Sequence, residues 1–260
     1  MNGQFDLDLT GQSALVTGST AGVGKSIATK LGSLGASVAV NGRSVKKGET
    51  VVNIIKKAGG DAIFHEADIT DYNEVRELVN ATADAFDGID ILVANGAASA
   101  APTPDFFENT AAEDLLAWCK YGYLSRLYPT KAALEYLKDG GRVVFITADA
   151  GKVATPAETG PGAMAAAVNM ATRVLAAEFA RYSITVNAVA LSVMRDTPAE
   201  RELMPDGDAA DIFEEAFNQQ SFDVTPADVA ELVTYFAGNN HAKPITGQIV
   251  SINGGVSFAG

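Results

Sequence analysis

The sequence has few residues of the kinds that build disulfides, metal sites and nucleic-acid interfaces. It contains one cysteine, Cys119, so an intramolecular disulfide is excluded. Its two histidines, His65 and His241, are far apart and have no ligand spacing around them, so we expect no metal site. Lysine and arginine number 19 against 32 aspartates and glutamates, which gives a net charge of −13. Because such a charge repels phosphate backbones and anionic membrane surfaces, we expect no nucleic-acid partner and no membrane partner.

Long apolar runs are also missing. The first ten residues show no basic segment followed by an apolar core, and no later run reaches the length that spans a bilayer. We therefore expect a cytoplasmic protein. A chain of 260 residues with 47% hydrophobic content can bury one large α/β core. Since no linker, internal repeat or low-complexity tract divides it, we expect a single domain over residues 1–260.

Seven short β-rich segments alternate with segments of helical length. Continuous apolar stretches such as 91–94 and 143–146 suit strands buried on both faces, and the helices between strands impose right-handed crossovers. This pattern predicts a doubly wound Rossmann fold with a seven-stranded parallel sheet and helices on both faces. The predicted strands lie near Ser13, Ser37, Ala62, Ile89, Arg142, Ile184 and Gln248.

Two features mark the last third of the chain. Thr225, Pro226 and Asp228 combine a helix cap, a first-turn proline and an acidic third position, which predicts a helix running through Phe236. The preceding stretch, residues 192–224, is acidic and interrupted by proline and glycine. We interpret it as a small lobe of loop and helix over the strand ends, with a merely solvated surface segment as the alternative.

The segment TGSTAGVG at 17–24 directly follows the first predicted strand and begins a helix. Glycines there permit a tight turn and a close approach of the backbone to a pyrophosphate, and the exposed N–H groups of a helix start favour negative charge. On its own this pattern is a moderate indication of a nucleotide site. The alternative is that the glycines only preserve the turn between strand and helix.

Four further segments accompany the glycine turn: VANGA at 93–97, Asp68 after the third strand, VNAVA at 186–190 and TGQIVSINGG at 246–255. With them the chain resembles the short-chain dehydrogenase/reductase family over essentially its whole length. The resemblance implies a nicotinamide dinucleotide site in which Gly18, Gly22 and Gly24 line the pyrophosphate, Asp68 and Ile69 line the adenine, and Asn95 lies on the adenosine side.

The choice between NAD and NADP depends on the end of the second strand. An acid that would hold the ribose 2′-hydroxyl is replaced there by Asn41, and Arg43 follows two positions later, which favours a 2′-phosphate. Ala21 stands where family members often have a basic residue, which weakens that preference. Arg43 is equally compatible with a surface arginine.

The residues that perform the family's chemistry are absent. Family enzymes use a serine, a tyrosine and a lysine four residues later, with an asparagine from the preceding long helix; the tyrosine moves the proton and the lysine lowers its pKa. These positions fall on Ala148, Pro161, Ala165 and, less securely, Gly122. The usual Pro-Gly after the sixth strand reads Leu191-Ser192. We predict no activity by the family mechanism, and hence no catalytic residue of that kind.

Neighbouring residues offer a possible replacement for the lost proton donor. Asp149 or Glu158 is the first candidate, and the others are Thr147, Thr159 and Tyr123. Such residues more often cap or solvate loops. If one of them does act, the chain is an enzyme of another class on the same fold, such as a lyase, an isomerase or a dehalogenase.

The helix from Gly162, GAMAAAVNMATRVLAAEFA, carries small side chains along its length and suits close packing. In the family this helix and the long helix before it form a four-helix bundle across the dimer axis, and the C-terminal strand contributes to a second interface. Packing within the chain alone is the alternative. We favour assembly with an active paralogue in a heterodimer or heterotetramer.

In this hypothesis the chain is a non-catalytic subunit, and its partner binds NAD and oxidises a β-hydroxyacyl-CoA. Whether the chain's own nucleotide site is open or empty is left undecided by the sequence. A third hypothesis is a binding protein that senses nucleotide levels without turnover.

Overall fold

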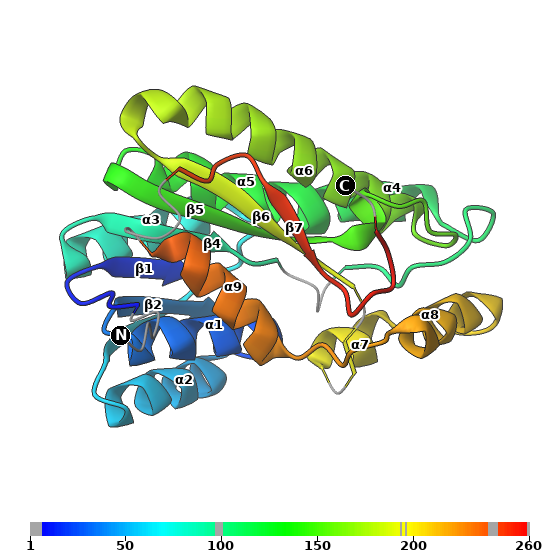
Figure 1. The fold of residues 1–260 in the computed structure, drawn as a ribbon, viewed down its shortest axis with the longest axis horizontal. Coiled ribbons are helices and arrows are strands. Elements are labelled where there is room, and N and C mark those ends of the chain that lie inside the picture. Colours follow the sequence, from blue (N-terminus) through cyan, green and yellow to red (C-terminus); the bar gives the residue numbers. More distant parts are fainter. Residues whose placement is uncertain (1–6, 97–100, 193, 196, 239–243, 259–260) are drawn as a thin grey trace, which may run out of the picture.

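A computed structural model describes residues 7–96, 101–192, 194–195, 197–238 and 244–258. Within them, a seven-stranded parallel sheet has the strand order β3-β2-β1-β4-β5-β6-β7 (Figure 1). The predicted fold class is confirmed. The strands are β1 (Ser13–Val16), β2 (Ser37–Gly42), β3 (Asp61–Glu66), β4 (Ile89–Ala94), β5 (Leu137–Ala148), β6 (Thr185–Leu191) and β7 (Ile249–Ile252).

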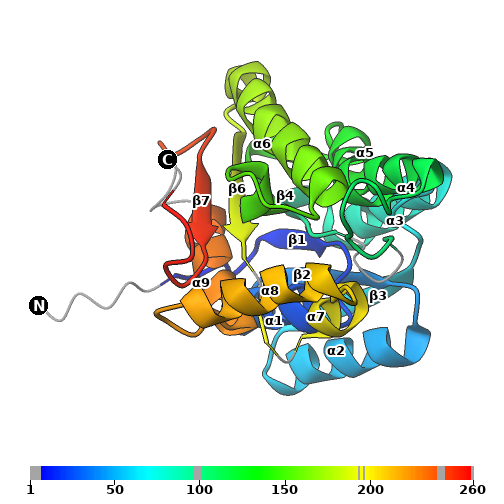
Figure 2. The same ribbon diagram turned by 90° about the vertical axis from the view of Figure 1, so that its right-hand side faces the viewer.

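Helices cover both faces of this sheet (Figure 2). One layer contains α1 (Gly22–Ser33), α2 (Val45–Lys57) and α9 (Pro226–Ala237). The other contains α3 (Tyr72–Phe86), α4 (Ala112–Trp118), α5 (Ser125–Ala133) and α6 (Thr159–Phe179). Two buried apolar clusters, one on each face, hold the layers to the strands. Within the described ranges, no helix combines the length and apolar character that crossing a membrane requires.

The strand order reverses between β1 and β4, which pair in parallel with Leu15 opposite Leu92. In doubly wound sheets the crevice at such a reversal, beyond the carboxyl ends of the strands, is where ligands bind. The fold therefore places the glycine turn after β1 and residue 95 after β4 at the same edge of the sheet.

Strand β5 begins earlier than the predicted start at Arg142. Leu137 already pairs with Ile89, and the register then shifts so that Arg142 lies opposite Ile91. Gly140, with φ of +94°, lies in this irregular stretch. The sequence pattern showed only the continuous apolar part of the strand, because residues 138–141, which separate it from Leu137, are polar or glycine.

Residues of the predicted lobe form α7 (Pro198–Leu203) and α8 (Asp208–Gln219), which extend beyond the sheet at its carboxyl edge (Figures 1 and 2). Residues 193 and 196 lie outside the described part. The helix cap predicted at Thr225 is confirmed, because the Thr225 amide donates to the Asp228 carboxylate at 2.8 Å and the Asp228 amide donates to the Thr225 hydroxyl at 3.4 Å.

Short turns of other helix types adjoin the long ones. A π-helix, η2 (Cys119–Leu124), joins α4 to α5. Two 3-10 turns follow later, η3 (Asp149–Gly151) after β5 and η4 (Ala180–Tyr182) after α6. Because η2 and η3 both face the carboxyl edge of the sheet, they shape the site described next.

Candidate cofactor and substrate site

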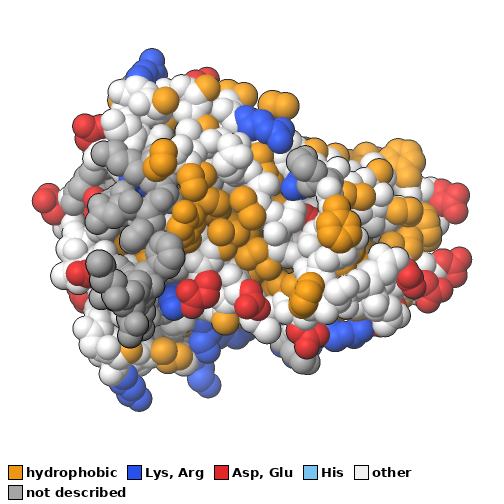
Figure 3. All heavy atoms as spheres, viewed as in Figure 1, with side chains coloured by type: hydrophobic (Ala, Val, Ile, Leu, Met, Phe, Trp, Pro, Cys, Tyr) orange, Lys and Arg blue, Asp and Glu red, His pale blue; other side chains and the backbone are white. Residues whose placement is uncertain are grey.

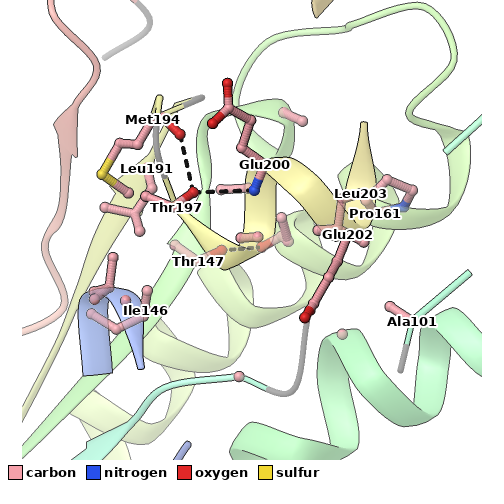
Figure 4. A pocket seen from close by; sticks show the side chains of 18 of the residues that line it. Ala101, Ile146, Thr147, Pro161, Leu191, Met194, Thr197, Glu200, Glu202 and Leu203 are labelled. Carbon is pink, nitrogen blue, oxygen red and sulfur yellow. Dashed lines mark hydrogen bonds between the residues drawn. The ribbon is translucent and has the colours of Figure 1, made fainter. Parts of the chain in front are cut away.

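A pocket of about 1150 Å³ lies at the carboxyl edge of the sheet, and residues of α7 and α8 form part of its lining. Figure 4 shows some of the lining side chains. The structure brings the predicted nucleotide residues and the altered catalytic positions to this one pocket. Its lining includes Gly18, Gly22, Gly24, Arg43, Asp68, Ile69 and Asn95, together with Gly122, Ala148, Pro161 and Ala165.

The glycine turn is shaped by contacts of its own backbone. Gly18 and Gly22 have left-handed φ angles of +58° and +51°, which side chains rarely adopt. A Cβ on Gly24 would collide with the Gly18 carbonyl. Helix α1 then begins at Gly22 with no side-chain cap from Ala21, so no cap pairs its first N–H groups, and the residues of its first turn line the pocket. The glycines are thus required for the turn, as the alternative interpretation holds, and an uncapped helix start beside them is of the kind that suits an anion, so the nucleotide site stays a prediction.

Two asparagine side chains, the buried Asn41 and the half-buried Asn95, hold the turn by hydrogen bonds. The Gly18 amide donates to Asn41 Oδ1 at 3.1 Å, and Asn41 Nδ2 donates to the Ala67 carbonyl at 3.2 Å. Asn95 Nδ2 donates to the Gly18 carbonyl at 3.0 Å. The Asn41 side-chain amide therefore forms its hydrogen bonds within the protein. The Asn95 side chain, predicted to lie on the adenosine side, supports the glycine turn.

The adenosine end of the pocket carries charge of both signs. Asp68 Oδ1 accepts hydrogen bonds from the Thr70 amide at 2.8 Å and the Thr70 hydroxyl at 2.7 Å. Burial raises the pKa of Asp68, but those hydrogen bonds and the charges of Arg43 and Lys120 outweigh it and lower the pKa overall. Arg43 and Lys47 line the pocket here, which suits a phosphate on the ribose.

At the end of the pocket where the family's reaction takes place, the residues at the altered catalytic positions have no side chain that can transfer a proton. Ala148 ends β5, and Pro161 and Ala165 lie one turn apart on α6. The adjacent Thr147 is buried, and its hydroxyl donates to the Ala165 carbonyl at 3.3 Å (Figure 4). Thr159 and Tyr123, the more distant candidates for replacement, do not line the pocket.

Asp149, the first candidate for relocated chemistry, is buried and fully engaged with the C-terminal segment. One oxygen, Oδ1, accepts from the Ser251 hydroxyl at 2.6 Å. The other, Oδ2, accepts from Asn253 Nδ2 at 2.6 Å and from the Ser257 hydroxyl at 2.8 Å. Because all three donors come from the C-terminal segment, this arrangement favours a structural role for Asp149.

Glu158 differs, because it lines the pocket at the start of α6 without such partners. Burial raises its pKa from 4.5 to about 7, and a hydrogen bond with Thr155 opposes only part of that shift. A carboxyl group with this pKa can accept or donate a proton near neutral pH. It is the one candidate for relocated acid–base chemistry that the geometry supports.

Arg126 is a pocket residue that the sequence reasoning missed. It lies on α5, four residues after Gly122, and burial lowers its pKa to about 10. The spacing in the sequence could have predicted it, because a residue one helical turn after a catalytic position lies on the same face of the helix. Its charge gave no indication of burial.

Helix α7 approaches the glycine turn. Pro198 Cδ lies 3.5 Å from where a Cβ on Gly22 would be. Glu200 and Glu202 of the same helix line the pocket, and the Glu202 side chain extends across it (Figure 4). In the described residues no group of three histidine, cysteine, aspartate or glutamate side chains is placed to hold a metal ion.

Comparison with known proteins now identifies the family. A family model described as enoyl-(acyl carrier protein) reductase matches residues 18–257. A 3-oxoacyl-[acyl-carrier-protein] reductase of Synechocystis is 32% identical over 252 residues, covering 95% of this chain and 98% of that protein. The chain belongs to the short-chain dehydrogenase/reductase family.

Solved structures agree with this family assignment. A dehydrogenase/reductase from Sinorhizobium meliloti superposes with a TM-score of 0.86 at 29% identity, over 97% of this chain and 98% of that one. A short-chain dehydrogenase from Burkholderia cenocepacia in complex with NADP has a TM-score of 0.83 at 31% identity, over 95% of this chain and 98% of that one.

The residues present fit one half of a nicotinamide dinucleotide better than the other. Arg43, Asp68 and the first turn of α1 fit an adenosine phosphate and a pyrophosphate. Leu191 and Ser192 also line the pocket, in the place of the family's Pro-Gly. The pocket therefore offers residues suited to an adenosine phosphate and a pyrophosphate, and it has Ala148, Pro161 and Ala165 at the positions predicted for the family's serine, tyrosine and lysine.

Proposed function

We propose that this chain is a non-catalytic subunit of a heteromeric NAD-dependent short-chain dehydrogenase. The active paralogue would oxidise a β-hydroxyacyl-CoA to the ketone. The supporting observation is that the positions of the family's serine, tyrosine, lysine and asparagine meet in one pocket as Ala148, Pro161, Ala165 and Gly122. The non-catalytic subunit of 2-(α-hydroxybenzyl)succinyl-CoA dehydrogenase, from anaerobic toluene degradation, resembles this chain in lacking those residues, and 2-(α-hydroxybenzyl)succinyl-CoA is the substrate that we propose for the partner.

The chemical argument concerns the proton on the substrate oxygen. Oxidation of an alcohol requires that this proton leave as the hydride is transferred, and a positioned acid–base group contributes typically 10²- to 10⁴-fold to such a step. A methyl group and a proline ring have no exchangeable proton, and Thr147 donates its own to the Ala165 carbonyl. In this proposal the chain shares its fold and its glycine turn with the reductases, but it does not share their proton-transferring side chains.

A nicotinamide dinucleotide, when bound, supplies the hydride acceptor. In this chain the first turn of α1 would hold the pyrophosphate, Arg43 would hold a ribose phosphate, and Asp68 and Ile69 would lie against the adenine. Without a proton-transfer group beside it, such a nucleotide would serve to order the pocket. The NAD that is reduced belongs, in this proposal, to the partner.

Exposed apolar side chains on α6 support assembly with a partner. Met170 and Val174, one turn apart, are 56% and 46% exposed. The sheet also ends at β7, an edge strand on which Val250 is exposed, and hydrophobic side chains gather over the middle of this face (Figure 3). Edge strands and apolar helix faces are typical of surfaces that a second subunit covers.

Purification of the tagged chain from its native host tests the proposal. We expect a second short-chain dehydrogenase to co-purify in a fixed stoichiometry, and the complex to reduce NAD with a β-hydroxyacyl-CoA. Met170→Asp should release the partner, whereas Ile54→Asp, at a residue of α2 that is 39% exposed, should not. Recovery of a homo-oligomer alone would contradict the proposal.

A second candidate function rests on Glu158. Its pKa of about 7 and its place in the pocket favour an enzyme of another class, such as a lyase, an isomerase or a dehalogenase, in which Glu158 moves a proton. That enzyme would act as a homogeneous preparation and lose activity in Glu158→Gln. A nucleotide sensor, the third hypothesis, would bind a dinucleotide tightly with no turnover of any substrate.

A further inference from the structure

The floor of the pocket carries a positive charge that no carboxylate of the described residues balances. Arg126 donates from Nε to the Ile146 carbonyl at 3.1 Å, and from Nη1 to the Tyr121 carbonyl at 2.7 Å and the Ser125 hydroxyl at 3.0 Å. A guanidinium has five N–H donors, and these bonds occupy those of Nε and Nη1. Those of Nη2, which lies against Gly96, have no acceptor among the residues that the structure describes.

The position of Arg126 makes an unbalanced charge costly. Its hydrogen bonds go to neutral oxygens, so the charge itself is not compensated, and a desolvated cation gains strongly from an anionic partner. Asp149 is held by Ser251, Asn253 and Ser257, and Glu158 and Glu202 form no ion pair with Arg126. The guanidinium therefore lines the pocket as a cation held in place by its own hydrogen bonds, where an anionic ligand would balance its charge.

Apolar side chains line the same pocket as this cation. Trp118, Ile146 and Pro161 line the same pocket, and the family's catalytic lysine and tyrosine are replaced by Ala165 and Pro161, which removes polar groups from this end. Residues suited to phosphate groups, Arg43 and the first turn of α1, line the adenosine end of the pocket. The two N–H donors of Nη2, which have no acceptor in the described part of the chain, suit a carboxylate, whereas a phosphate dianion is usually held by more donors.

We propose that Arg126 anchors a binding site for the carboxylate of a small, mainly apolar acid. The site is independent of the proposed subunit role, because an enzyme of another class on this chain would carry the same floor. The protein's net charge of −13 disfavours non-specific binding of anions, so an anion that binds tightly does so at a local site.

Benzoate and its neutral isostere benzamide are suitable probes of the full-length protein. Trp118, the only tryptophan of the chain, is buried beside the pocket and reports binding by its fluorescence. We expect benzoate to bind at least tenfold more tightly than benzamide. Equal affinity for the two, or displacement of benzoate by an equal concentration of inorganic phosphate, would overturn the proposal.

Substitutions then assign the charge to Arg126. Arg126→Met should weaken benzoate binding at least tenfold, and Arg126→Lys should retain part of it, while Arg76→Met, at an exposed residue of α3 outside this pocket, should leave it unchanged. Full benzoate affinity in a folded Arg126→Met variant would refute the site. If both variants fail to fold, the comparison of benzoate with benzamide on the unaltered protein still decides the proposal.

Discussion

The Asp149 carboxylate, directly after β5, accepts a hydrogen bond of 2.6 Å from the hydroxyl of Ser251, which lies 102 residues later on β7. The same side chain reaches Asn253 and Ser257, so one buried acid ties the rim of the pocket to the C-terminal segment. A residue with these contacts holds the edge of the sheet in place. It also explains how β7, an edge strand of four residues, stays fixed.

Replacement of Asp149 should therefore destabilise the fold. Asp149→Asn puts an N–H donor opposite donors and removes the charge, and we expect a loss of about 1–3 kcal/mol in the free energy of unfolding. Chemical denaturation measures it. Asp84→Asn, at an exposed position of α3, is the control and should change stability by less than about 0.5 kcal/mol. An unchanged stability for Asp149→Asn would show that the network contributes nothing.

Stability should depend on pH through Glu158. Because its pKa in the folded protein is about 7 and its ordinary value is 4.5, the folded state binds the extra proton between these values. The stability present below pH 4.5 is then lost as the pH rises through about 7. Glu158→Gln removes this dependence and should stabilise the protein at pH 8 by about 1–3 kcal/mol, with little effect at pH 4.5.

Thermal and denaturant unfolding at both pH values measure the effect of Glu158. Glu77→Gln, at an exposed position of α3, is the matched control. A gain in stability of the same size for both substitutions would show that general charge reduction, and not burial of Glu158, is responsible.

Nucleotide preference should depend on Arg43. Because this arginine lines the pocket beside Asp68, Arg43→Ala should weaken NADP binding about tenfold and change NAD binding little. Calorimetric titration of both nucleotides provides the measurement. Lys46→Ala, an exposed residue of α2 outside the pocket, should affect neither. Equal loss for NAD and NADP would remove the assignment of Arg43 to a 2′-phosphate.

Much of the fold follows from the sequence because its signals are local. Continuous apolar runs mark β4 and β5, and the Thr225–Asp228 cap marks the start of α9. The early start of β5 was missed because Leu137 joins the sheet by pairing with Ile89 across a register shift. Such pairing is a tertiary property that hydrophobic periodicity does not contain.

The sequence predicted which residues line the pocket. It predicted far less about the contacts that their side chains make. Alignment with the family's motifs located Ala148, Pro161 and Ala165, and all of them line the pocket. That Asn95 supports the glycine turn, and that Arg126 has no carboxylate partner among the described residues, depend on side-chain directions. The raised pKa of Glu158 likewise comes from burial, and burial arises only when distant segments pack.

The most direct test of the central claim is the rate of NAD reduction with a β-hydroxyacyl-CoA, measured for the purified chain alone and for its complex with the active paralogue. We expect no turnover above the uncatalysed background for the chain alone. The complex should turn over and lose its activity when the paralogue's own catalytic tyrosine is changed to phenylalanine. Turnover by the chain alone, or an active complex after that change, would contradict the account.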